Sequence, residues 1–314
     1  QGCEFTGNVA VEDGGGACLR GEDTTGNYLV PIFVSCTFTG NEAGNNGGAI
    51  AAPSWYEDGV GYHNSNVAVM IGTSNSQPNA TEGCLFQNNV ALGNAGNGKG
   101  GAVFLSRTNT ISILYNNTYV GNRSEFGGGF FLDDAFSWVS HSRFFGNRAI
   151  YSGGAIELEN STYLINQSII DGNRAERGAG IISNYSANVI MESTLVVSNF
   201  SNTNGGGISM VEGTLYAFNS IFWNNYGANG TDEEAQASSY GEPLHNFAYN
   251  SCVQGSSGES WNNEWGTWSV LNTEPRFVDL LGPDNIPGTG DEDYHLIATS
   301  PCIDAGTNFP YENE

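Results

Sequence analysis

Four carboxylates lie near the middle of the chain, and paired carboxylates are the usual catalytic groups of glycoside hydrolysis. They are Asp133, Asp134, Glu157 and Glu159. When the repeats described below are aligned, Asp133 and Glu159 take the same outward position on successive units. Their carboxyl groups would then lie about 5–7 Å apart, the spacing of an acid and a nucleophile. No lysine accompanies the group as a lyase base, and a solvated acidic face is the favoured interpretation.

Three arginines form a second group, because each directly follows an asparagine of the repeat: Arg123, Arg148 and Arg174. Stacked cations repel one another unless anions lie between them. Glu125 and Glu176 are close in sequence, so surface ion pairing is the favoured interpretation. A carboxylate-bearing glycan is the alternative partner.

The C-terminal region offers hard oxygen ligands of the kind that calcium prefers. The candidates are Asp279, Asp284, Asp291 and Asp293. Their spacing fits no EF-hand loop. Calcium is therefore an alternative, and the leading expectation is that the protein has no cofactor.

Several N-x-S/T sequons occur, and those in expected turns or loops are the better glycosylation candidates. These are Asn79, Asn160, Asn184 and Asn229. The sequons at Asn122 and Asn199 belong to the repeat itself, where burial of the asparagine would block a glycan.

The six cysteines form no CxxC pair, and the four histidines are scattered, so no zinc cluster is indicated. An even number of cysteines in a lysine-poor chain favours disulfides and an oxidising compartment. We expect Cys252 to pair with Cys302 because both lie in the closing region. Cys3, Cys36 and Cys84 share one position of the repeat, so the coil spacing would also allow a Cys3–Cys36 bond, which would leave Cys18 for Cys84.

These groups are positioned by a repeat. An apolar-x-x-Asn element recurs eight times, with its asparagines at Asn8, Asn41, Asn89, Asn122, Asn147, Asn173, Asn199 and Asn225. A glycine-pair element such as "GGAIEL" follows in seven copies. The period from Asn122 to Asn225 is about 25 residues, which is in the solenoid range.

Each period contains three short strand-like runs and no helical pattern. After the glycine pair, Ile156 and Leu158 alternate with Glu157 and Glu159, so one side faces inward and the other outward. The pattern predicts an all-β parallel β-helix of about eight coils plus closing coils, with a ladder of stacked asparagine amides. Outward Phe104, Phe131 and Ile182 indicate a covered face, the cover being the insertion before Cys84 or another subunit.

The GGAI and FxxN phrases resemble the repeats of chlamydial polymorphic outer membrane proteins over roughly residues 1–225. The resemblance implies a right-handed, pectate-lyase-like parallel β-helix used for adhesion at a cell surface. "EPRFVD" followed by "DEDYHLIATSPCIDAG" resembles the closing segment of secreted bacterial β-helix proteins, with its SPxIDAG motif. This second resemblance implies a location and no particular reaction.

The sequence divides into three parts. Residues 1–225 hold the coils, with insertions at about 20–33 and 53–80. Residues 226–268, rich in Gly, Ser, Asn and Trp, are expected to form a loop or cap excursion. Residues 269–314 are expected to form closing coils and a C-terminal segment.

Charge limits the partners. The formal net charge is -24, with nine basic residues. A phosphate backbone or an acidic membrane surface is therefore a poor partner, and no stretch of about 18 apolar residues would insert into a bilayer. The first coil starts at residue 1 with no room for a cap, which favours a head-to-tail homopolymer in which one subunit's C-terminal region covers the next subunit's first coil.

The leading hypothesis is a secreted or cell-surface, non-enzymatic β-helix protein with a structural or adhesive role. Glycans are candidate ligands and modifications. The alternative is a polysaccharide lyase or glycoside hydrolase acting at the Asp133/Glu159 face.

Overall fold

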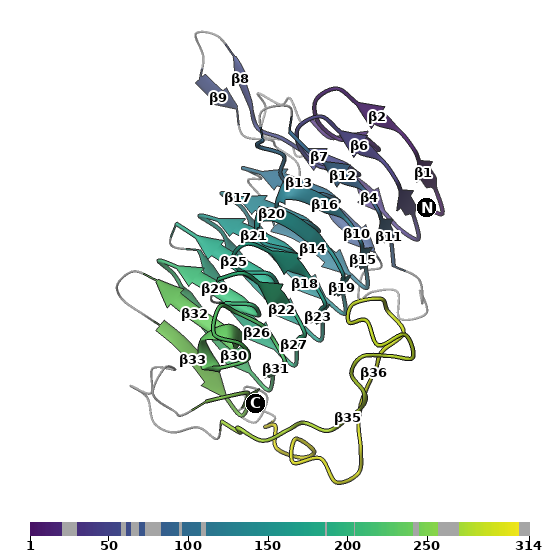
Figure 1. Cartoon of the computed structure of the whole chain (residues 1–314). Coiled ribbons are helices and arrows are strands. Elements are labelled where there is room, and N and C mark those ends of the chain that lie inside the picture. Colours follow the sequence, from purple (N-terminus) through teal and green to yellow (C-terminus); the bar gives the residue numbers. More distant parts are fainter. Residues whose placement is uncertain are drawn as a thin grey trace, which may run out of the picture.

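The computed structural model describes residues 1–20, 30–57, 61–63, 69–72, 83–93, 96–107, 111–185, 187–203, 205–240, 245–256 and 270–307. Across these ranges the chain winds into a right-handed parallel β-helix (Figure 1). The sequence prediction of the fold class is confirmed. None of the described helices is long and apolar enough to cross a membrane.

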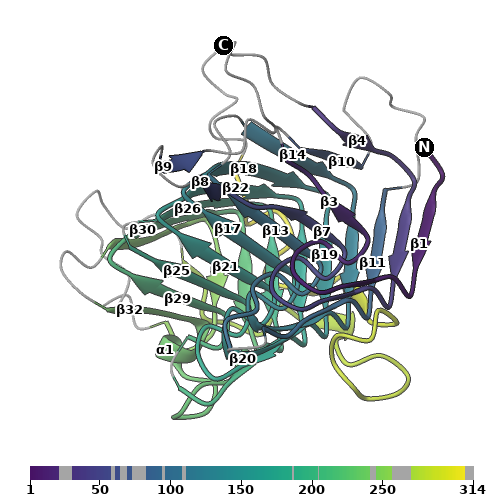
Figure 2. The same cartoon turned by 90° about the horizontal axis from the view of Figure 1, so that it is seen from above.

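Four parallel sheets, named A to D in the order in which one coil visits them, form the walls (Figure 2). Sheet A contains β1 (Glu4–Thr6), β5 (Thr37–Thr39), β11 (Leu85–Gln87), β15 (Thr118–Val120), β19 (Arg143–Phe145), β23 (Ile169–Asp171), β27 (Leu195–Val197), β31 (Ile221–Trp223) and β34 (Cys252–Val253). Sheet B contains β2 (Val9–Ala10), β6 (Glu42–Ala43), β12 (Val90–Ala91), β16 (Arg123–Phe126), β20 (Arg148–Ser152), β24 (Arg174–Ala175) and β28 (Phe200–Ser201).

Sheet C contains β3 (Ala17–Cys18), β7 (Ile50–Ala52), β13 (Val103–Ser106), β17 (Phe130–Asp133), β21 (Ile156–Glu159), β25 (Ile181–Asn184), β29 (Ile208–Val211) and β32 (Ala237–Tyr240). Sheet D contains β4 (Ile32–Phe33), β10 (Met70–Gly72), β14 (Ile111–Tyr115), β18 (Phe136–Ser140), β22 (Thr162–Asn166), β26 (Asn188–Glu192), β30 (Thr214–Phe218) and β33 (His245–Tyr249). Among the described residues, two antiparallel pairs and one helix lie outside these sheets: β8 (Trp55–Glu57) with β9 (Gly61–His63), β35 (Phe277–Asp279) with β36 (Asp293–Leu296), and α1 (Glu233–Gln236).

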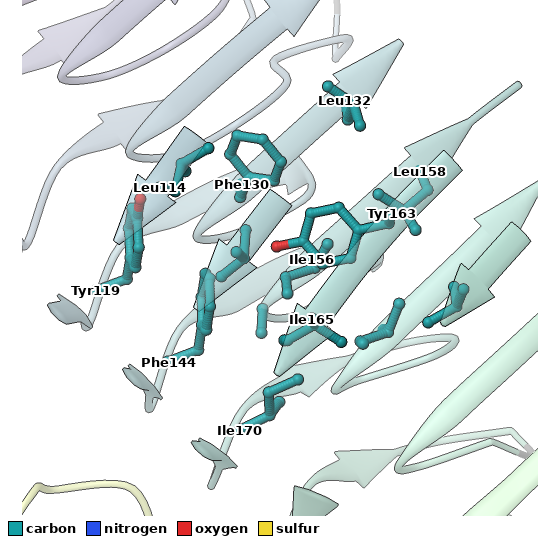
Figure 3. Packing of buried hydrophobic residues seen from close by; sticks show 14 of the residues in the cluster. Leu114, Tyr119, Phe130, Leu132, Phe144, Ile156, Leu158, Tyr163, Ile165 and Ile170 are labelled. Carbon is teal, nitrogen blue, oxygen red and sulfur yellow. The ribbon is translucent and has the colours of Figure 1, made fainter. Parts of the chain in front are cut away.

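The apolar residue of each repeat enters the core and stacks on its equivalent one coil away. Ring centroids lie 4.5 Å apart for Phe5–Phe38, 4.9 Å for Phe38–Phe86, 4.8 Å for Phe86–Tyr119 and 4.5 Å for Tyr119–Phe144. Ile170 continues the column after Phe144 (Figure 3). Phe38, Phe86, Tyr119 and Phe144 are fully buried. These stacked rings combine area burial with favourable ring geometry, so this column is a main source of stability.

The asparagines form the predicted ladder. Asn147 Nδ2 donates to Asn173 Oδ1 at 3.0 Å and to the Tyr119 carbonyl at 2.9 Å, while Asn147 Oδ1 accepts from both nitrogens of Asn122. The same pattern links Asn8 through to Asn225. The ladder satisfies the buried backbone at each turn between sheets A and B.

A glutamine that does not belong to the repeat ends this ladder. Asn225 donates to Gln236 Oε1 at 2.9 Å, and the Gln236 side chain is fully buried. Gln236 is held there by α1, whose N-cap Asp232 accepts from the Ala235 N–H at 2.9 Å. The helix therefore supplies the last acceptor of the ladder.

The last third of the chain departs from the predicted boundaries. Within the expected excursion of 226–268, strands β32, β33 and β34 extend sheets C, D and A by one further coil. Instead of further coils, residues 276–307, here named the C-terminal segment, include the antiparallel pair β35–β36 and turn back along sheet A (Figure 1). The described residues of this segment complete no coil.

Candidate functional site

The four acidic residues do lie together on sheet C, and the predicted register is present. Asp133 on β17 pairs with Glu159 on β21, one coil away. Each carboxylate, however, has a partner within the protein. Asp133 accepts from the Ser106 hydroxyl at 2.8 Å, and Asp134 accepts from the Asn160 amide at 3.2 Å. These contacts are those of a structural polar face.

Glu157 is buried in the wall, with 2% of its surface exposed. It accepts from the Ser152 hydroxyl at 2.8 Å and from the Asn184 amide at 3.0 Å. Burial raises the pKa of Glu157 to about 8. The hydrogen bond from Ser152 opposes this shift, and the negative charge of Glu159 adds to it. A raised carboxyl pKa is typical of a general acid, but this side chain does not face solvent.

The expectation that no lysine accompanies the acidic group is wrong. Lys99, the only lysine of the chain, pairs with Glu159 at 3.1 Å and lies 4.3 Å from the centre of the Phe131 ring. Sixty residues separate Lys99 from Glu159 in the sequence, but the solenoid brings them to nearby coils. The ion pair engages the one amine that could have served as a base.

Side chains from sheet B and from a connection between sheets B and C pack on the outward apolar column. Phe104 and Phe131 are buried with Phe126 packed against them, and Lys99 lies over Phe131. Ile182 is also buried, with 1% of its surface exposed. Phe126 and Lys99 thus cover part of this column from within the same chain.

The arginine column is in direct register on sheet B: Arg123 pairs with Arg148, and Arg148 with Arg174. All three side chains are exposed. The expected ion pairs are not formed. Glu125 turns inward and accepts from the backbone of Gly93 and Gly98, and Glu176 accepts from the Asn202 amide.

The four candidate calcium ligands do not converge. Asp279 and Asp284 accept from the backbone of their own turns, Asp291 from the Thr289 hydroxyl, and Asp293 from His295. Among the residues that the structure describes, no three acidic, histidine or cysteine side chains form a group that could hold a metal ion. The spread of these carboxylates does not favour calcium.

The candidate glycosylation sites differ in access. Asn229 and Asn160 are exposed, although Asn160 also donates to Asp134. The Asn184 amide is engaged by buried Glu157. Asn79 lies outside the described residues. Asn160 and Asn229 thus present the more accessible amides.

All six cysteines are reduced in this structure. Cys36 and Cys84 stack on adjacent coils, with the Cys36 N–H 3.4 Å from Cys84 Sγ. The position continues with Asn117, Ser142 and Ser168, whose side chains accept from the preceding coil in the same way. The Cys302 thiol interacts with the Cys252 thiol. Burial, and to a smaller extent this neighbour, raises the pKa of Cys252 to about 12.

We predict that air-oxidised protein contains Cys36–Cys84 and Cys252–Cys302 bonds and that Cys3 and Cys18 stay free. Non-reducing peptide mapping reads the links directly, and a Cys3→Ser variant serves as a control that keeps both. Closing the loop from Cys252 to Cys302 should add about 4 kcal/mol to the free energy of unfolding. A Cys3–Cys36 link would contradict this pairing and restore the alternative drawn from the repeat.

Asp171 attaches the C-terminal segment to sheet A. Its carboxylate accepts from the Gly288 N–H and from the Tyr294 hydroxyl, both at 2.8 Å, while Oδ1 is buried without a hydrogen-bond partner. Burial raises the pKa of Asp171 to about 8, although the Tyr294 hydrogen bond opposes the shift. Glu292 and Tyr294 on the segment are the other titratable groups at this contact.

Docking of the segment is expected to weaken between pH 5 and pH 8. Because the folded-state pKa lies above the ordinary value of 3.8, the contribution of Asp171 is complete at about pH 4 and below. It declines by up to about 1.4 kcal/mol per pH unit as the pH rises toward 8. Hydrogen exchange at Gly288, corrected for intrinsic rates, measures this change. Asp171→Asn should flatten the pH profile of this exchange, whereas the control Asp284→Asn, at an exposed residue, should leave it unchanged. A wild-type slope in Asp171→Asn would refute the assignment.

With this geometry in view, the fold and surfaces define a right-handed parallel β-helix protein. A scan against protein-family models matches residues 35–53 to the Chlamydia polymorphic membrane protein repeat. This stretch holds Phe38, Asn41 and the glycine pair Gly47–Gly48, so the chain carries a repeat of the kind that the sequence resembles. Comparison with curated proteins and with solved structures finds no match.

Proposed function

We propose that the protein is a cell-surface β-helix with a structural or adhesive, non-enzymatic role. The observation that carries this proposal is the series of stacked coils, in which the parallel sheets and the asparagine ladder from Asn8 to Asn225 repeat from one coil to the next. The match to a polymorphic membrane protein repeat supports a surface-exposed location of that type. Secretion and glycosylation at Asn160 or Asn229 belong to the same proposal.

The engagement of the acidic face supports the non-enzymatic reading. Glycoside hydrolysis needs two carboxylates that face the sugar from either side of the scissile bond. Here Glu159 is paired with Lys99, Asp133 accepts from Ser106, and Glu157 is buried. The raised pKa of Glu157 is the one observation that favours the enzymatic alternative.

An activity screen separates the two functions. Purified protein is incubated with pectins, alginates and neutral glycans, and product formation is measured for wild type and for Asp133→Asn. We expect no turnover from either, together with adhesion of protein-coated beads to cell surfaces. Turnover by the wild type that Asp133→Asn abolishes would establish the enzyme and reject our proposal.

Head-to-tail assembly is a further part of the proposal. On the first coil, Val9 and Val11 are 74% and 82% exposed, and Phe5 is only half-buried although the stacked Phe38 is fully buried. Apolar groups and strand edges of this kind favour association with another chain. Light scattering of the purified 314-residue chain should detect species larger than a monomer; a strictly monomeric solution at high concentration would rule this out.

A further inference from the structure

We propose that the arginine column of sheet B, with the aromatic rings that continue it, is a binding groove for a carboxylated polysaccharide. This inference rests on the proposed surface role and adds a ligand class and a site to it.

Charge is the first argument. The protein has a net charge of -24 and nine basic residues, yet three of them occupy successive positions of one exposed column. Like charges placed directly opposite on neighbouring strands are destabilising. Among the described residues, no ion pair offsets this repulsion: Glu125 is bound to backbone N–H groups and Glu176 to Asn202. An external anion with regularly spaced charges would offset it.

The column changes from cations to aromatic rings along the axis. Arg174 pairs with Phe200, and Phe200 is bridged to Tyr226 on the next coil. The Phe200 and Tyr226 rings are stacked at 6.0 Å and are 43% and 46% exposed. With coils about 4.8 Å apart, the stripe from Arg123 to Tyr226 is about 19 Å long. Exposed aromatic faces next to charges suit a ligand with both apolar and anionic surfaces.

The surface is hollowed at the centre of this stripe. A groove of about 340 Å³ is lined by Arg148, Ile150, Arg174, Glu176, Phe200 and Asn202. The guanidinium groups can bind carboxylates in a bidentate manner. The Glu176 carboxylate can accept hydrogen bonds, and the Asn202 amide can both donate and accept them, so both side chains suit the hydroxyl groups of a sugar.

This mixture favours a polysaccharide over other polyanions. A linear polyuronate repeats one carboxylate per sugar, as the column repeats one arginine per coil, and its hydroxyls can donate to Glu176. A duplex nucleic acid carries one phosphate charge per about 1.7 Å of its axis, a spacing much denser than one arginine per coil.

The test is calorimetric binding of polygalacturonate to the purified chain in low salt, with EDTA present to exclude bridging by calcium. Fully methyl-esterified polygalacturonate is the matched ligand control, since it lacks only the charges. We expect binding of the carboxylated polymer alone, weakening as salt is added. Arg148→Gln and Arg174→Gln should each reduce affinity about tenfold, the loss of one charged hydrogen-bonding group. Phe200→Ala should reduce it several-fold.

Arg143→Gln is the matched control variant, because Arg143 is exposed on neighbouring β19 and lies outside the groove. Its affinity should stay within twofold of wild type. Three outcomes would overturn the inference. The esterified polymer binds as tightly as the carboxylated one, Arg143→Gln loses as much affinity as the groove variants, or poly-glutamate or single-stranded DNA binds in place of polyuronate. If the double variant Arg148→Gln/Arg174→Gln adheres to cells as well as wild type does, the groove fails while the adhesive function stands.

Discussion

Replacing Asn147 with alanine is expected to lower the free energy of unfolding by about 3–5 kcal/mol. The substitution removes the acceptor of both nitrogens of Asn122 and a donor to the carbonyl of Tyr119 on the preceding coil, and it removes one donor to Asn173 Oδ1 on the following coil. Each unsatisfied buried group costs about 1–3 kcal/mol, and a broken chain of amides loses its mutual polarisation as well. Chemical denaturation followed by circular dichroism gives the difference.

Asn97→Ala is the matched control for the ladder variant, because Asn97 is exposed in a turn. It should change stability by less than about 0.5 kcal/mol. A loss for Asn147→Ala no larger than that of the control would show that the amide ladder contributes little and that the aromatic column alone holds the coils together.

A single methyl group at Gly154 is expected to be at least as damaging, with a loss of about 3 kcal/mol or more, or failure to fold. A Cβ at this position would lie 2.4 Å from the Ala179 carbonyl oxygen and 2.7 Å from that of Arg174. Both obstacles are backbone of the next coil, so no side-chain rotation can relieve the overlap. The second glycine of the pair is therefore required by the close stacking of coils.

Gly40→Ala isolates the contribution of backbone conformation. Gly40 has a φ of +59°, and nothing lies within 4 Å of an added Cβ. The expected loss is about 1–2 kcal/mol, the cost of a left-handed conformation for an ordinary residue. Thermal melts of both variants measure the two costs separately. A Gly154→Ala protein as stable as Gly40→Ala would contradict the steric argument.

The sequence predicts the periodic part of this structure because each coil repeats the same physical problem. The apolar-x-x-Asn spacing identifies both the aromatic column and the ladder, and the offset from the glycine pair places Asp133 beside Glu159. The position shared by Cys3, Cys36 and Cys84 continues in later coils with small polar residues, and this continuation was not predicted from the sequence. A small polar or thiol residue, such as Cys84, Ser142 or Ser168, stands two residues before the apolar position and forms the second internal ladder.

What the sequence could not predict are contacts that do not repeat. The pairing of Lys99 with Glu159 depends on how far each turn projects, and the contact of Asp171 with Gly288 joins residues 117 positions apart. Gln236 takes over the ladder from a helix that has no equivalent in other coils. The motif around Ser300 was recognisable, but its role was not: Ser300 donates to the Pro275 carbonyl and accepts from the Cys302 N–H, which fixes the turn.

The C-terminal segment changes how the molecule would respond to tension. In a solenoid each coil contacts only its neighbours, so a free end can peel away one coil at a time. Here one segment holds several coils at once, through Gly146, Asp171 and Asn219. A force applied on the C-terminal side of Thr307 is first borne by these lateral hydrogen bonds, which must break before the terminal strands are loaded. Under tension the C-terminal segment would therefore detach and extend first, while the stacked coils remain folded.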